Sequence, residues 1–119
     1  MLPRSERLTT RQFATAFSQA RPIRHALLQV RVFRREPNAS TKTAGTRAAF
    51  VVPKKVGKAV VRNRLRRRVR EIYRLHSSRE KLAARSLDLI FLLSPNALNT
   101  SNDEMARALD DVLRRVLRA

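Results

Sequence analysis

The chain contains no cysteine, no tryptophan and only two glycines. Without cysteine it can form no disulfide and no thiolate ligand set, which fits a reducing compartment. Neither a phosphate-cradling P-loop nor a G-x-G-x-x-G dinucleotide loop is present. No apolar run approaches the roughly 20 residues needed to span a bilayer, and the N-terminus lacks the apolar stretch of a signal peptide. We therefore expect a cytoplasmic protein with no membrane association.

Residues that commonly catalyse hydrolysis or group transfer are also scarce. The nine acidic residues are scattered, and Asp110 and Asp111 occupy adjacent helical positions that point apart. His25 and His76 stand in no metal-ligand spacing, so we expect ordinary surface or partly buried rings. The sequence thus predicts no catalytic or metal-binding residue. Any reaction that involves this protein would take its catalytic centre from another molecule.

Positive charge is abundant by contrast. The 119 residues include 27 Lys and Arg against nine acids, a formal net charge of +18, and 22 of the 27 are Arg. Such an imbalance favours nucleic acid or an anionic membrane as partner, and the planar guanidinium suits phosphate oxygens. Length and composition predict one domain, residues 1–119, with a single modest core.

The charge is densest from Lys54 to Arg74, which holds ten Lys or Arg and a single acid, Glu71. At about 100° per residue, apolar side chains fall on one side of a helix over 57–76. They are Val61, Leu65, Val69, Ile72 and Tyr73. Arg62, Arg66 and Arg70 follow one another on another face, which Asn63, Arg67 and Arg74 continue. Because such close guanidinium groups repel one another, a polyanionic partner is indicated.

The remaining patterns predict an α/β two-layer sandwich with the order helix, two strands, helix, strand, helix around a small mixed sheet. Residues 1–8 are expected to be flexible, and a T-x-x-Q capping box (Thr9, Gln12) starts a helix to about Gln19. Strands are predicted over 27–33 and 48–52, joined as a hairpin by the polar loop 34–46. After a charged connector, 77–86, the apolar run 86–93 predicts a central strand buried on both faces. Ser101 and Glu104 form a capping box for the last helix.

Phe13 and Phe17 lie one turn apart on the first predicted helix. The pattern favours core packing for this pair. The alternative is an aromatic platform at the rim of a nucleic-acid groove, on which bases stack without being read.

The segment KKVGKAVVRNRLRRRVRE resembles the signature of the bacterial ribonuclease P protein component, K-K-[VI]-G-N-A-V-x-R-N-R-x-K-R-x-x-R. The matching positions are Lys54, Lys55, Val56, Gly57, Ala59, Val60, Arg62, Asn63, Arg64, Arg67 and Arg70, with Arg66 in place of Lys. The resemblance extends over nearly the whole chain, including Phe13-x-x-x-Phe17. Four positions depart from the pattern: Lys58, Pro53, Ser94 and Arg31, where many relatives carry an aromatic residue.

The resemblance implies an α/β sandwich with a left-handed β-α-β crossover. It also implies a protein that binds a large catalytic RNA and the 5′ leader of precursor tRNA, whose removal depends on Mg²⁺ held mainly by the RNA. The RNA-facing residues implied are Lys54, Lys55, Arg62, Asn63, Arg64, Arg66, Arg67 and Arg70. The leader-cleft residues implied are Phe13, Phe17, Arg31, Val51 and Lys55. No organic cofactor and no obligate protein partner are expected.

Three other interpretations remain open on the residues alone. A ribosomal or structural RNA-binding protein shares the charge but would not stimulate leader removal. A DNA-binding protein would use 57–76 as a major-groove helix and bind specific duplexes. A membrane-surface helix is disfavoured because so short a chain needs that apolar side for its core.

Overall fold

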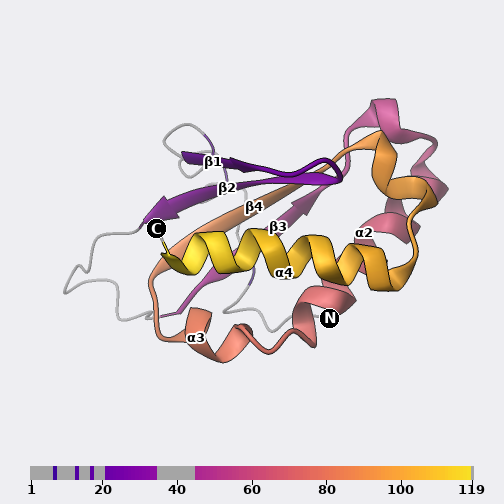
Figure 1. Ribbon diagram of the computed structural model, residues 1–119. Coiled ribbons are helices and arrows are strands. Elements are labelled where there is room, and N and C mark those ends of the chain that lie inside the picture. Colours follow the sequence, from indigo (N-terminus) through magenta and orange to yellow (C-terminus); the bar gives the residue numbers. More distant parts are fainter. Residues whose placement is uncertain (1–6, 8–12, 14–16, 18–20, 35–44, 119) are drawn as a thin grey trace.

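The computed structural model describes Arg7, Phe13, Phe17, residues 21–34 and residues 45–118 (Figure 1). The elements are β1 (Arg21–Arg24), β2 (Leu28–Arg34), β3 (Arg47–Val51), the 3₁₀ turn η2 (Lys54–Val56), α2 (Ala59–Arg74), α3 (Arg79–Ala83), β4 (Leu87–Leu93), the 3₁₀ turn η3 (Pro95–Asn99) and α4 (Asn102–Arg118). The predicted flexible segment 1–8, the Thr9–Gln12 capping box and the helix to Gln19 lie outside the described residues, apart from Arg7, Phe13 and Phe17. Arg7 forms a parallel bridge with Ala48, and both phenylalanines are helical.

The sheet has the strand order β1-β2-β4-β3, in which β4 is antiparallel to β2 and parallel to β3. The predicted hairpin between strands 27–33 and 48–52 is therefore wrong, because β4 lies between these two strands. The observed hairpin joins β1 to β2, and β1 was not among the predicted strands. Its four residues, RPIR, are too few to show the alternation of apolar and polar residues that identifies a strand. Proline and arginine are typical of an exposed sheet edge.

The predicted central strand is confirmed. Six of the seven residues of β4 are buried, and Leu92 is the exception. Leu89 and Phe91 face the main core, whereas Asp88 and Ile90 point to the opposite side of the sheet. There Arg47 of β3 donates two hydrogen bonds to Asp88, Nε to Oδ1 at 2.8 Å and a terminal nitrogen to Oδ2 at 2.9 Å. This pairing satisfies a carboxylate that is only 2% exposed.

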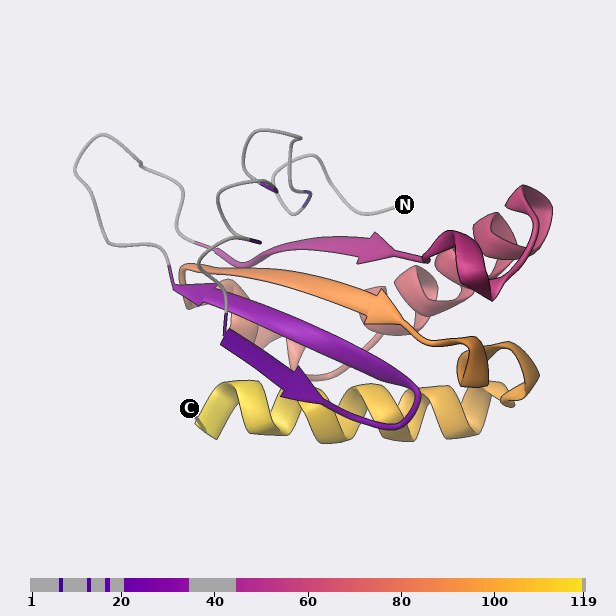
Figure 2. The same ribbon diagram turned by 90° about the horizontal axis from the view of Figure 1, so that it is seen from above.

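The helices α2 and α4 cover one face of the sheet, as the two ribbon views show (Figures 1 and 2). In Figure 2 the helices lie behind the sheet, the parallel strands β3 (magenta) and β4 (orange) both run from left to right, and β4 lies below β3. The chain leaves the right-hand end of β3, passes behind the sheet through α2 and returns to the left-hand end of β4. This is the left-handed crossover that the resemblance implied, against the usual handedness. No described helix combines the length and the apolar character that crossing a membrane requires.

Helix boundaries differ slightly from the prediction. The long basic helix begins at Ala59 and ends at Arg74, and the predicted connector 77–86 contains the short helix α3. At the start of α4 the Ser101 hydroxyl accepts the Glu104 backbone N–H at 3.1 Å, which confirms the predicted cap.

Gly57 lets the chain turn from η2 into α2. Its φ of 157° lies in a region that side-chain-bearing residues rarely adopt, and an added Cβ would meet Val61 Cγ1 at 3.3 Å. We predict that Gly57→Ala lowers the free energy of unfolding by about 1–3 kcal/mol, measured by urea denaturation. Lys58→Ala, at an exposed neighbour without a side-chain cap bond, is the control and should change it by less than about 0.5 kcal/mol. Equal unfolding midpoints for both variants would show that Gly57 is not conformationally required.

Candidate nucleic-acid interface

The orientation of α2 is set by three buried side chains, Leu65, Val69 and Tyr73. The centroid of the Tyr73 ring lies 5.6 Å from that of Phe50 on β3 and 5.4 Å from that of Phe91 on β4. The Phe50 and Phe91 rings stack with their centroids 5.0 Å apart. Aromatic pairs at such distances prefer defined relative geometries, so the cluster resists rotation of α2 about its axis. The predicted apolar side of the helix therefore faces the sheet, and the opposite side faces solvent.

The solvent-facing side of α2 carries the predicted arginines, which we call the arginine front: Arg62, Arg64, Arg66, Arg67 and Arg70. Arg64 and Arg67 are exposed, and the other three are partly exposed. Arg62 Nε donates to the Gly57 carbonyl at 3.1 Å, and Arg66 donates to Asn63 Oδ1 at 2.8 Å. Within the described residues no carboxylate forms an ion pair with any member of the front. Its positive charge is therefore not neutralised by the described carboxylates.

The one acid of α2 does not neutralise this front. Arg74 Nε donates to Glu71 Oε1 at 3.1 Å, three residues away along the helix. These hydrogen bonds from Arg74, reinforced by its charge, lower the pKa of Glu71. The carboxylate therefore stays ionised at neutral pH and is satisfied by a residue outside the front.

Arg68 has a structural role that the sequence analysis did not assign. Its Nε donates to Asn102 Oδ1 at 2.6 Å, and a terminal nitrogen donates to the Thr100 carbonyl. These bonds join α2 to the residues that lead into α4. Arg68 lies one turn after Arg64 on α2, but its partners are 32 and 34 residues distant, so periodicity could not identify its separate role.

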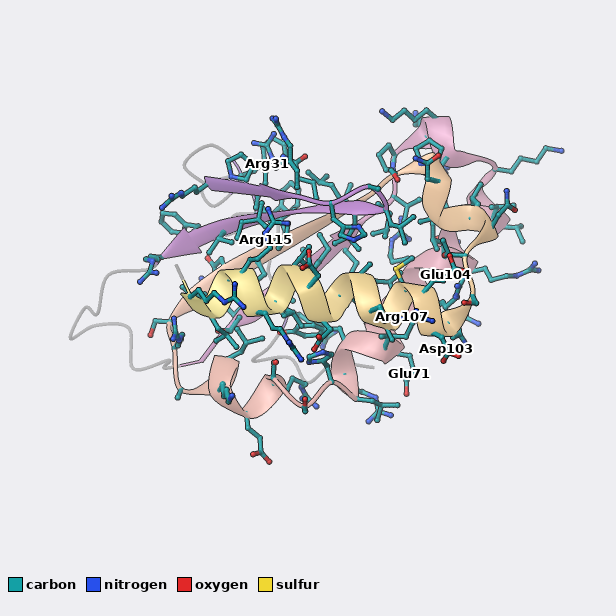
Figure 3. The ribbon with its side chains drawn as sticks, in the orientation of Figure 1. Arg31, Glu71, Asp103, Glu104, Arg107 and Arg115 are labelled. Atoms are coloured by element: carbon teal, nitrogen blue, oxygen red, sulfur yellow. The ribbon has the colours of Figure 1, made fainter. Side chains whose placement is uncertain are left out.

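The predicted leader-cleft residues lie on the sheet face that α2 and α4 leave uncovered. Phe13 and Phe17 stack with ring centroids 5.7 Å apart, and Arg31 of β2 places its guanidinium carbon 4.2 Å from the Phe17 centroid. Arg31 projects on the side of the sheet away from α4 (Figure 3). Its Nε is buried and has no hydrogen-bond partner within the structure that is described.

Val51 and Lys55 extend this surface toward the end of β4. Strand register places Arg31 in a row with Ile90 and Ala49, and the next row runs Arg24, Gln29, Leu92 and Val51. Arg24, Gln29 and Leu92 of that second row line a hollow of about 350 Å³, which Lys55 and His25 also line. Among the five predicted residues, Phe17 therefore contacts both Phe13 and Arg31, and Val51 and Lys55 lie further toward the end of β4.

The two histidines behave as predicted, as partly buried rings. His25 Nδ1 accepts the Leu27 backbone N–H at 3.1 Å, and His76 Nε2 lies 3.1 Å from Asp110 Oδ1. No three His, Asp or Glu side chains converge to hold a metal ion anywhere in the described part of the chain.

Comparison with known proteins agrees with this geometry. The model of the ribonuclease P family matches residues 2–117. The ribonuclease P protein component of Streptomyces avermitilis is 38% identical, with 98% of this chain and 96% of that protein covered. That of Streptomyces bikiniensis is 40% identical over the same shares.

Solved structures share the fold. A Staphylococcus aureus RNase P protein mutant with defective mRNA degradation activity superposes with a TM-score of 0.76 at 20% identity, covering 94% of this chain and 88% of that one. The RNase P protein from Thermotoga maritima superposes with a TM-score of 0.73 at 23% identity, covering 92% and 96%.

The contrast between Arg68 and its neighbour Arg67 gives a stability prediction. We expect Arg68→Ala to lower the free energy of unfolding by about 1–3 kcal/mol, because it removes two inter-element hydrogen bonds and leaves the Thr100 carbonyl without this donor. Arg67→Ala, at an exposed position, should change it by less than about 0.5 kcal/mol. Chemical denaturation of both variants tests this, and a larger loss for Arg67→Ala would contradict the assignment.

Proposed function

Because the chain belongs to the ribonuclease P protein family, we propose that it binds the RNA subunit of ribonuclease P through the arginine front and the 5′ leader of precursor tRNA through the opposite sheet face. Family membership gives its place in a ribonuclease complex and in tRNA processing. The finer assignment rests on one observation, the arginine front without acidic partners in the described residues. We expect the protein to act in the cytoplasm, together with both RNAs.

The arginine front suits a folded RNA better than the other polyanions. Its guanidinium groups lie on a helix whose apolar side is already buried against β3, β4 and α4, so that side is not available to a membrane surface. Contacts from a row of arginines to phosphates position an RNA without reading its sequence. Lys54 and Lys55, exposed on η2 just before the helix, lengthen the same basic track, and Asn63 orients Arg66 within it.

The opposite face suits a single strand. Unstacked bases can lie on aromatic rings or on guanidinium planes, and here Phe13, Phe17 and Arg31 offer both. Gln29 and Val51 continue the surface toward Lys55, whose charge can meet the strand's phosphates. The leader would thus pass along the uncovered face while the RNA subunit contacts α2.

We assign the chemistry of phosphodiester hydrolysis to the RNA subunit. Magnesium ions prefer oxygen ligands and bind readily where carboxylates and phosphates meet, whereas the described residues near both surfaces are mainly cationic or apolar. The residues present therefore do not fit a magnesium site formed by this chain alone. The protein would contribute by neutralising phosphate charge and holding the leader.

Reconstitution tests this proposal. Addition of the protein to the cognate RNA subunit at low Mg²⁺ should restore cleavage of the leader from precursor tRNA. Arg64→Gln/Arg67→Gln should bind that RNA more weakly, and the slope of log affinity against log salt should fall by about 0.7–0.9 for each phosphate that the variant no longer neutralises.

The control is Lys81→Gln/Arg114→Gln, which removes the same charge from exposed positions on α3 and α4. It should retain most of the affinity and of the slope. Tight RNA binding without any restored cleavage would instead favour a structural RNA-binding protein. An equal loss of RNA affinity in both double variants would show that the arginine front contributes only non-specific charge.

The leader assignment makes a separate prediction. Phe17→Leu removes the ring over which Arg31 lies and should weaken binding of leader-bearing precursor by about 1–3 kcal/mol, the usual worth of a base–aromatic stack. Mature tRNA, which lacks the leader, serves as the control ligand and should bind almost unchanged. Equal weakening of both RNAs in equilibrium binding would assign Phe17 to the core instead.

A further inference from the structure

A hollow of about 370 Å³ lies at the β1 edge of the molecule, away from both surfaces described above. It is lined by Arg21, Pro22 and Ile23 of β1, Val32 and Arg34 of β2, and Arg115 of α4. This volume falls within the usual range of small-molecule sites, about 300–1,000 Å³. Three guanidinium groups around one concavity make it a candidate anion site.

The strand register places this hollow on the α4 side of the sheet. Arg21 pairs with Val32, and Ile23 pairs with Val30, which is completely buried in the core between sheet and helices. Side chains alternate along a strand, so Arg21, Ile23, Val32 and Arg34 all project toward α4. Arg31 projects to the other side, as Figure 3 shows, so the hollow is not part of the proposed leader surface.

Arg115 is held over the hollow by a defined contact. One of its terminal nitrogens donates to the Arg24 carbonyl at 2.7 Å, and the same nitrogen lies 3.4 Å from Asp111 Oδ2. Asp111 can offset the charge of Arg115, and no carboxylate among the described residues forms an ion pair with Arg21, so positive charge remains at the site. Ile23 and Val32 pack only partly against the core and supply an apolar wall below these guanidinium groups.

This combination matches one nucleotide of a nucleic-acid strand. Guanidinium groups donate to phosphate oxygens in bidentate fashion, and an apolar wall beside them can carry the face of a base. A peptide that adds to the exposed edge of β1 is disfavoured, because Pro22 lacks a backbone N–H and the flanking arginines protect the edge.

We propose that this hollow, the β1-edge pocket, binds a nucleotide of the RNA subunit and forms a second RNA contact on the helix side of the sheet. The inference rests on the proposed function insofar as the ligand is that RNA. The RNA would then contact the protein at two separate places, α2 beside β3 and the pocket beside β1, at opposite edges of the sheet. Two such contacts would fix the orientation of the protein on the RNA as well as add affinity.

The test measures equilibrium binding of the RNA subunit by full-length variants. Arg21→Gln and Arg115→Gln should each weaken binding several-fold and lower the salt slope by about 0.7–0.9, the change expected when one phosphate is no longer neutralised, and Arg21→Glu should weaken binding further. Arg114→Gln and Arg114→Glu are matched controls, since Arg114 is adjacent in the chain, 67% exposed and not part of the pocket. Arg115 also joins α4 to β1, so Arg115→Gln could fail to fold. In that case the variants at the exposed Arg21 provide the test.

The outcomes separate this inference from the proposed function. If the Arg21 variants bind like the Arg114 controls while Arg64→Gln/Arg67→Gln binds weakly, the pocket is not an RNA contact and the arginine front stands. If Arg64→Gln/Arg67→Gln also binds normally, the proposed function fails too. In amide NMR titrations, adenosine 5′-monophosphate should shift the signals of Ile23 and Val32 in the native protein and not in Arg21→Gln. Unmoved signals in the native protein would overturn the nucleotide assignment.

Discussion

The packing of Tyr73 against Phe50 and Phe91 is the contact on which the rest of the structure depends. It joins α2 to β3 and β4, the two parallel strands that this helix connects. Once the ring is seated, Leu65 and Val69 must also face the sheet, because they lie two turns and one turn earlier on the same side of the helix. The arginines on the opposite side are then exposed by geometry. Burial of apolar area offsets the mutual repulsion that these close charges would cause in an isolated helix.

The two faces of the sheet serve different purposes because β4 is buried on both. On one face its leucines and Phe91 complete the core with α2 and α4. On the other, Ile90 is completely buried although it lies outside that core, and Asp88 holds Arg47. Arg31 pairs in register with the buried Ile90 on this face. The proposed leader surface therefore lies on the face opposite the main core.

Three basic regions emerge, and their separation bears on how a large RNA could be recognised. The arginine front lies beside β3, the β1-edge pocket lies at the other edge of the sheet, and the Phe13, Phe17 and Arg31 surface lies on the reverse face. Phosphate contacts carry no sequence information, so orientation must come from their spacing on a rigid body. A net charge of +18 on 119 residues supplies attraction, and the fold distributes it into defined places.

Local patterns in the sequence determined the long basic helix with its apolar side, the central strand, the last helix with its Ser101 cap, and the family. Each depends on residues close in the chain, whose periodicity reports burial directly. Only the tertiary structure decided the strand order, which refuted the expected hairpin between 27–33 and 48–52 and introduced β1. It also supplied the Arg68 contact with Asn102, the Arg47–Asp88 pair and the β1-edge pocket. The two side-chain pairs join residues at least 34 apart in the chain, and the pocket is lined by three separate elements. Local periodicity reports which side of an element is buried, but it does not identify the distant residue that a side chain contacts.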